Sequence, residues 1–200
     1  MIGRVKMMKW AMAALGLILA GCGSTPVEDA ANMPYFAPGR LLELPRPGDL
    51  GRSVEMSQMI TVRHDGEVFA FEGHISVSPE RFLLVGVDGI GRRAMSVTWE
   101  KSGRITAERA DWLPPAVRPG PMLADIVLLY WPAGVLRQAL LPAGAMVTDT
   151  PGRRRIAIDD VDVLIVDYMA GGDQATGGRL HYRNTAWGYE IDVQSVEVVP

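Results

Sequence analysis

Apolar and polar residues alternate over much of the chain, and this period of two constrains the fold more than any other feature. In residues 54–63 most apolar side chains share one parity, at Val54, Met56, Ile60 and Val62, and the other parity is mostly polar, at Glu55, Ser57, Thr61 and Arg63. Such alternation predicts a half-buried β-strand. The dipeptide Asp65-Gly66 follows, and Asp-Gly between two alternating runs predicts a tight hairpin.

The same pattern repeats further along the chain. Residues 69–77, 81–87, 95–100 and 104–110 are expected to form strands, separated by turn sequences such as Asp88-Gly89. Strands at hairpin spacing predict an antiparallel meander. Adjacent antiparallel strands joined in this way tend to build a curved sheet or barrel.

The pattern changes at residue 110, where the Pro-rich stretch ADWLPPAVRPGP leads into MLADIVLLYWPAGVLRQALLP. Pro132 divides the second stretch into a mostly apolar segment that ends at Trp131 and a short helix with the proline in its first turn, where proline fits. Strands are expected to resume at RRRIAI, residues 153–158, and to continue through VDVLIVDYMA, GRLHYRN and YEIDVQSVEVV. The chain is therefore predicted to be mainly β with short helices.

The N-terminus has the layout of a bacterial secretory signal. Three basic residues precede the apolar run 11–20, and the small residues Ala20 and Gly21 follow. The run is short for a membrane-spanning helix, which needs about 20 apolar residues. We expect residues 1–21 to be a signal peptide; an uncleaved N-terminal anchor is the alternative.

Cys22 is the only cysteine of the chain, so no intrachain disulfide can form. The stretch Leu19-Ala20-Gly21-Cys22 resembles the lipobox of bacterial lipoproteins, which implies a diacylglycerol on the Cys22 thiol and cleavage just before it. Two or more acyl chains hold a protein stably at a membrane. Residues 22–38 are then a lipidated tether and residues 39–200 a single domain. An Asp directly after the lipidated cysteine resembles the inner-membrane retention signal of enteric bacteria. This chain has Gly23 there, which favours localisation at the periplasmic face of the outer membrane.

Composition excludes one class of partner. Without residues 1–21 the chain carries 17 Lys+Arg against 23 Asp+Glu, a net charge of −6. Phosphate backbones require a basic face, so nucleic acid is not expected as a partner. About 180 residues suit one domain.

The sequence carries no recognisable motif of catalysis or metal binding. His64, His74 and His181 lack the spacing of a metal site. No nucleophile elbow is present, and the glycine-rich residues 86–91 lie in a meander, which indicates a turn rather than a phosphate cradle. We expect no catalytic residues, no metal and no cofactor.

Two charged clusters have ordinary interpretations. The acidic residues at 159, 160 and 162 lack calcium-loop spacing and suit a solvated turn. The basic run 153–155 is expected to be exposed strand-edge charge that discourages aggregation, with contact to lipid headgroups or to the acidic rim of a carrier as the alternative.

The order of segments resembles a family of proteobacterial lipoproteins often encoded beside aryl-polyene pigment biosynthesis enzymes. A lipobox, a meander, ADIVLLYWP with a short helix, and final strands ending in LHYRNTAWGYEIDVQSVEV carry the resemblance. That family is similar in architecture to the lipoprotein receptor LolB and its periplasmic carrier LolA. The resemblance implies a curved, half-open antiparallel β-barrel with a helical lid. It also implies an apolar cavity that binds or transfers an acyl cargo, either a lipoprotein or a polyene lipid, and a LolA-like carrier as a candidate partner.

Aromatic, methionine and aliphatic side chains suit the lining of such a cavity, because methionine adapts to guests of varied shape. The candidates are Phe69, Phe71, Phe82, Met95, Trp99, Trp112, Tyr130, Trp131, Leu136 and Ile165. For each of them, ordinary core packing is the alternative. Ile90, between glycines at a turn, is the candidate for a membrane-contact loop.

Two other functions stay open at this stage. The chain can be a non-catalytic scaffold lipoprotein that binds a protein partner in the cell envelope. It can also be a hydrolase whose site has no recognisable motif.

Overall fold

A computed structural model describes residues 32–114, 117–169 and 178–198. The predicted signal peptide and Cys22 lie outside the described residues. The sheet strands have the following bounds: β3 Val54–His64, β4 Glu67–Val77, β5 Arg81–Val87, β6 Arg93–Glu100, β7 Ile105–Arg109, β8 Ala145–Thr150, β9 Arg153–Ile158, β10 Val161–Tyr168, β11 Arg179–Asn184 and β12 Tyr189–Glu197.

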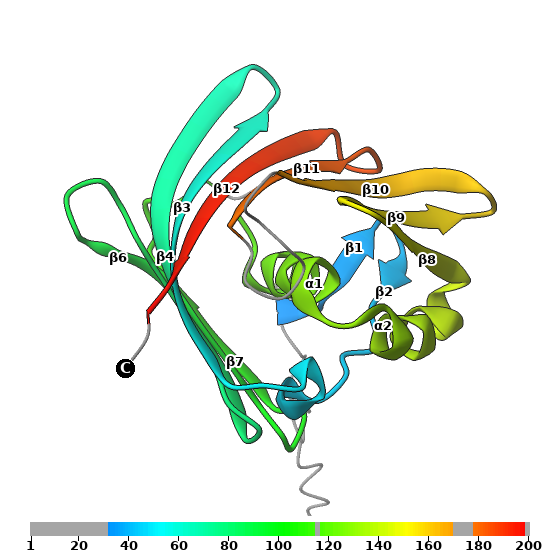
Figure 1. Cartoon of the computed structure of the whole chain (residues 1–200). Coiled ribbons are helices and arrows are strands. Elements are labelled where there is room, and N and C mark those ends of the chain that lie inside the picture. Colours follow the sequence, from blue (N-terminus) through cyan, green and yellow to red (C-terminus); the bar gives the residue numbers. More distant parts are fainter. Residues whose placement is uncertain (1–31, 115–116, 170–177, 199–200) are drawn as a thin grey trace, which may run out of the picture.

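These strands form one antiparallel sheet in the order β7-β6-β5-β4-β3-β12-β11-β10-β9-β8. The sheet curves strongly, so that β7 and β8 form its two ends and the concave side faces the helices (Figure 1). The prediction of a mainly β chain with a curved, half-open antiparallel sheet and short helices is confirmed.

The alternation in the sequence determines which side chains face the concave side. On β3 the side chains of Val54, Met56 and Ile60 are buried, while their odd-numbered neighbours are exposed or half-buried. β3 and β4 pair without a shift from Val54–Val77 to His64–Glu67. Asp65 and Gly66 close this hairpin with φ values of 51° and 80°, the conformation that a two-residue turn of this kind requires.

Two helices and a small hairpin occupy the concave side (Figure 1). They are α1 Pro119–Tyr130, α2 Ala133–Leu140 and the pair β1 Tyr35–Ala37 and β2 Arg40–Leu41, with short 3-10 turns η2 Pro47–Leu50 and η3 Leu141–Ala143. Pro132 separates the helices as expected, although it is the N-cap residue of α2 rather than part of its first turn. In the described part of the chain, no helix combines the length and apolar character needed to cross a membrane.

The structure also contains elements that the sequence pattern did not indicate. β8 lies at the sheet edge before the predicted run 153–158, so that run forms the second strand from the edge. β1 falls within the stretch predicted to be tether, and its Phe36 is fully buried. The folded part of the chain therefore begins before residue 39.

The start of α1 lies directly against the start of the described chain. A Cβ atom on Gly120 would be 2.3 Å from the carbonyl oxygen of Met33 and 2.4 Å from the carbonyl carbon of Asn32. Only a residue without a side chain allows this approach, so the N-terminal segment and α1 fix each other's position.

We expect Gly120→Ala to destabilise the domain by about 1–3 kcal/mol, because the methyl group forces backbone to move. Gly134→Ala is the matched control, since Gly134 is the second residue of α2 and has open space around it. There the helix propensity of alanine makes the change neutral or stabilising, by up to about 1 kcal/mol. Urea unfolding of residues 23–200 measures both, and equal midpoints for the two variants would contradict the close contact.

Candidate functional site

The candidate site is the concave side of the sheet, which α1 fills. Eleven of its twelve residues are buried. Pro119 occupies its first turn, where proline costs no hydrogen bond. A helix that is apolar all round is stable only when it is enclosed on every side, and the curved sheet with β1 provides that enclosure.

On the side of β5 and β6, the helix end meets a cluster of aromatic rings. The Trp131 ring centroid lies 5.8 Å from that of Trp99 and 6.5 Å from that of Phe82. The Trp131 Nε1–H donates to the carbonyl oxygen of Arg46 at 3.2 Å. All three rings are at most 1% exposed. Tilted ring pairs of this kind each contribute about 0.5–1.5 kcal/mol beyond the burial of their area.

On the opposite side, a buried carboxyl group anchors the middle of α1. Asp125 accepts hydrogen bonds from the hydroxyls of Tyr182 on β11 and Tyr189 on β12, each at 2.5 Å. Burial raises the pKa of Asp125 to about 7, and the two tyrosine hydroxyls offset part of that rise. Burial also raises the pKa of both tyrosines, and the neighbouring Asp125 adds to it. Asn184 completes the cluster by donating to the carbonyl oxygen of Phe36 on β1.

A second polar contact holds the last residue of the helix. Gln58 on β3 donates from Nε2 to the Tyr130 hydroxyl at 2.7 Å and to the Ser195 hydroxyl on β12 at 2.9 Å. Gln58 is 3% exposed, so these bonds satisfy an amide group that would otherwise be costly to bury.

A buried guanidinium holds the C-terminal end of α1. Arg154 on β9 is fully buried and donates from Nη1 to the carbonyl oxygens of Leu128 at 2.7 Å and Trp131 at 2.9 Å. Its other nitrogens form a two-pronged pair with Asp149 on β8 at 2.8 and 2.9 Å. Helix C-termini carry partial negative charge, so a cation there is favourable. Removing one member of such a buried pair costs about 3–5 kcal/mol, more than a ring contact contributes.

The structure brings six of the predicted cavity residues into one closed core. Phe82, Met95, Trp99, Tyr130, Trp131 and Leu136 are all buried in it. Phe71 is half-buried and packs against this core, and Phe69 is half-buried further along β4. These side chains belong to the hydrophobic core on the concave side of the sheet, where the helices lie.

Three predicted residues lie elsewhere. Ile165 lies between the fully buried Leu164 and Val166 and opposite Arg155 and Arg183, so its side chain is on the convex face. The run from Val163 to Val166 is apolar at every position, and its sequence gave no indication of which face each residue takes. Trp112 is 47% exposed outside the core, with the Arg92 guanidinium 4.7 Å from its ring centre. Ile90 is 79% exposed at the β5–β6 turn.

One surface depression is lined by residues of the β4–β5 turn, the start of β5, the end of β6 and the turn after it, and no helix residue lines it. It is open, about 730 Å³ in volume, and is lined by Ser78, Glu80, Arg81, Glu100, Lys101 and Ser102. Among the described residues, no group of three or more His, Cys, Asp or Glu side chains is arranged to hold a metal ion.

Sequence reasoning missed the polar anchors of α1. Asp125 carried a usable signal, since it is a single acidic residue within the apolar run MLADIVLLYW. Arg154 was expected to be exposed with its neighbours, but alternation along β9 points it inward while Arg153 and Arg155 face solvent. These two neighbours pair with carboxylates of β10, as the structure shows for Arg153 and Asp167 at 2.5 Å.

We expect Arg154→Gln to lower the free energy of unfolding by about 3–5 kcal/mol, because it removes the guanidinium from the carbonyls of α1 and from Asp149. The matched control is Arg153→Gln on the adjacent, half-exposed pair, which should cost at most about 1 kcal/mol. Urea unfolding reports both values. A loss for Arg154→Gln as small as that of the control would show that the guanidinium does not hold α1.

The raised pKa of Asp125 predicts a pH-dependent stability. The unfolded carboxyl ionises near its ordinary pKa of 3.8 and the folded one near 7, so the folded state binds the proton more tightly. The protonated Asp125 therefore contributes its full share to the free energy of unfolding below about pH 4. This share declines as the pH rises to about 7, by a few kcal/mol in total. Asp125→Asn should remove this part of the slope, whereas Asp111→Asn, at an exposed position, should retain it. Identical pH profiles of Asp125→Asn and the parent would contradict the assignment.

Comparisons with known proteins complete the description of the site. A structure of a LolA superfamily protein from Nitrosomonas europaea is similar at 10% identity, over 77% of this chain and 92% of that one, with a TM-score of 0.40. A DUF1329 family protein from Desulfovibrio piger is similar at 5% identity, over 75% and 87% of the two chains, with a TM-score of 0.30. No curated protein matches the sequence. The family model described as "Protein of unknown function (DUF3261)" matches residues 55–197, so the chain belongs to the DUF3261 family.

Proposed function

We propose that this protein is a lipid-anchored lipoprotein that binds an acyl chain, of a lipid or of a lipidated cargo, between the concave face of its sheet and α1. The observation that carries the proposal is the nature of α1, an apolar helix enclosed in the hollow of an open sheet. A strongly curved sheet leaves more space than its own side chains fill. In this protein α1 lies in that space, and a hydrocarbon guest can take over part of its apolar contacts with the sheet.

The energetics allow such an exchange. Each buried methylene contributes about 0.8 kcal/mol relative to water, so ten of them contribute about 8 kcal/mol. The ring contacts of Trp131 with Phe82 and Trp99 are individually worth much less. A guest that replaces helix contacts with contacts of its own therefore costs the fold little.

The lipobox resemblance of residues 19–22 supports the anchor, and the family resemblance supports the kind of cargo. We propose that Cys22 carries the acyl anchor at the periplasmic face of the outer membrane and that the cargo is a lipoprotein or a polyene lipid, delivered by a LolA-like carrier. Ile90 would contact the membrane from the tip of the β5–β6 turn, where it is strongly exposed. Trp112 with Arg92 above its ring supplies an aromatic and a cationic group beside it.

A scaffold function is the second candidate, because apolar side chains gather on the convex face as well. Met59 on β3 is 54% exposed, and Val196 on β12 is 63% exposed two register positions away. Val198 donates its backbone N–H to Glu55 beside them and is also exposed. A protein partner that covers this face would need no internal cavity.

Lipid binding separates the two functions. We expect residues 23–200, which contain every described element, to retain a co-purified lipid in native mass spectrometry and to bind a fluorescent fatty acid saturably. The expected stoichiometry is one acyl guest per chain. A clean protein mass together with a linear, unsaturable titration would exclude acyl binding and favour the scaffold.

A further inference from the structure

α1 is attached to the two halves of the sheet in different ways. Among the described residues, the hydrogen bonds between α1 and sheet side chains go to β3 and β9–β12, through Asp125, Tyr130 and the last carbonyls of the helix. Toward β5 and β6, the contacts at the helix end are the apolar rings of Phe82, Trp99 and Trp131. The buried polar and charged contacts cost more to break than the ring contacts. If α1 separates from part of the sheet, it therefore separates from β4–β6.

The inner face of β4 and β5 has a local lack of side chains. Gly73 and Gly86 are direct partners in the β4–β5 ladder, and neither has the positive φ that would call for glycine. A Cβ atom on Gly73 would lie 3.1 Å from the Cδ1 of Ile60, and one on Gly86 would lie 3.1 Å from the Cγ of Met95. Glycine inside a strand often marks a place where another group approaches closely. Here flexible side chains occupy that place.

Apolar residues continue in both directions from this glycine pair. Toward the hairpin end lie Phe71 and Phe69, which have the same parity as Gly73 and are half-buried. The β3–β4 hairpin that carries them projects beyond α1 (Figure 1). In the other direction lie Leu84 and the rings of Phe82 and Trp99. We call this inner-face row, from Phe69 through Gly73 and Gly86 to Trp99, the apolar track.

The length of the track suits one acyl chain. From Phe71 to Val77, the ladder partner of Phe82, a strand rises about 20 Å at about 3.4 Å per residue. That is close to the length of one extended long-chain fatty acyl group. Since the track residues are apolar or glycine, a guest that lies along it must be hydrocarbon, with its polar end at the hairpin rim.

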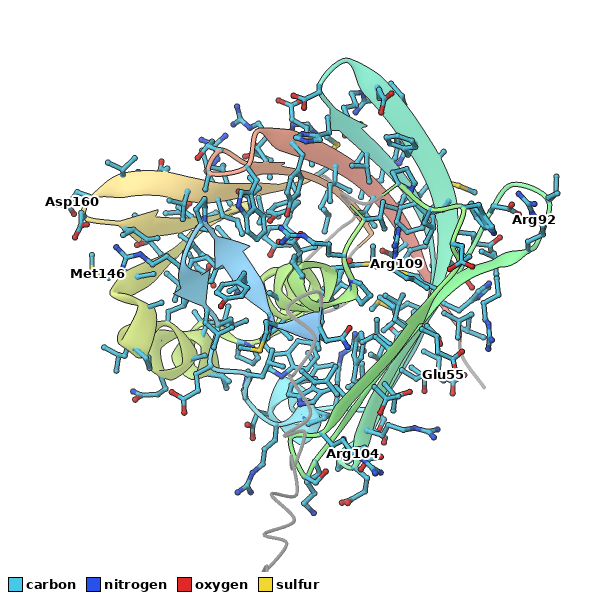
Figure 2. All side chains as sticks on the ribbon, turned by 180° about the vertical axis from the view of Figure 1, so that it is seen from behind. Glu55, Arg92, Arg104, Arg109, Met146 and Asp160 are labelled. Carbon is cyan, nitrogen blue, oxygen red and sulfur yellow. The ribbon has the colours of Figure 1, made fainter. Side chains whose placement is uncertain are left out.

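We propose that the acyl guest binds along the apolar track, between α1 and the inner face of β4–β6, with its chain end at Phe82, Trp99 and Trp131. This location rests on the proposed function and specifies it. α1 remains bound to β9–β12 through Asp125 and Arg154 while the guest displaces its contacts with the track. Figure 2 shows Glu55 on the outside of the sheet, and Arg92 and Arg104 at the turns that connect β5–β6 and β6–β7. The charged groups that it labels on this half of the molecule therefore lie outside the track, and the guest's place is the inner face.

Tryptophan quenching tests the location. The protein, purified from membranes and kept soluble in an amphipathic polymer, carries Trp112→Phe and Trp187→Phe, with Trp10→Phe added for any chain that keeps residues 1–21, so that only Trp99 and Trp131 emit. We expect dibrominated stearic acid to quench this emission saturably, whereas unbrominated stearic acid should not quench it. Equilibrium dialysis with radiolabelled stearic acid measures binding independently.

The two readouts distinguish the failure of each proposal. Saturable binding without quenching of Trp99 and Trp131 overturns the location and leaves the proposed function standing. The absence of saturable binding by dialysis overturns both.

A blocking variant provides a second test. Gly73→Val fills the centre of the track and should weaken stearic acid binding about tenfold, while Ala70→Val, on the convex face of the same strand, should leave it unchanged. Gly86→Ala is the milder variant if Gly73→Val does not fold, and it should weaken binding in the same direction. Unchanged affinity in a folded blocking variant would overturn the location.

Discussion

The structure depends on the mutual burial of α1 and the curved sheet. The sheet has a concave side that its own side chains do not cover, and α1 has no polar face with which to meet water. Each element supplies the surface that the other lacks. Because the aromatic cluster of β5 and β6 and the buried tyrosines of β10–β12 both contact the helix, the helix joins two ends of the sheet that are far apart in strand order.

Burial alone does not fix where the helix lies, because the hydrophobic effect has no direction. Directional contacts do so at three points along its length. The backbone of Asn32 and Met33 meets Gly120 at its start, the tyrosine hydroxyls meet Asp125 in its middle, and the guanidinium of Arg154 meets its last carbonyls. An unpaired polar group in such a core is costly, so these contacts exclude sliding or rotation of the helix on the β9–β12 side.

Sequence reasoning identified what depends on local pattern. Alternation on β3 and β4 with Asp-Gly at the turn specifies a hairpin and its buried face, and the structure agrees to the register. β8 was not predicted, because Met146 lies on its exposed side and its last three residues are polar. Its six residues therefore show little alternation of apolar and polar side chains. The burial of Arg154 was not predicted for a different reason. Whether an arginine faces a helix end or solvent depends on which element packs behind the strand, and that is a property of tertiary structure.

A hollow occupied by α1 is compatible with the proposed acyl transfer, if the proposed anchor holds the protein beside a membrane. An acyl chain in a bilayer is already out of water, so its move into an apolar protein site changes the hydrophobic free energy little. The same holds for the wall of the track in the proposed complex, where contacts with hydrocarbon would replace ring and methyl contacts with α1. Transfer between two such environments needs no energy source, and small differences in affinity decide its direction. A permanently open cavity would instead expose its aromatic lining to water between cargoes, whereas a plug formed by the chain's own helix keeps it covered.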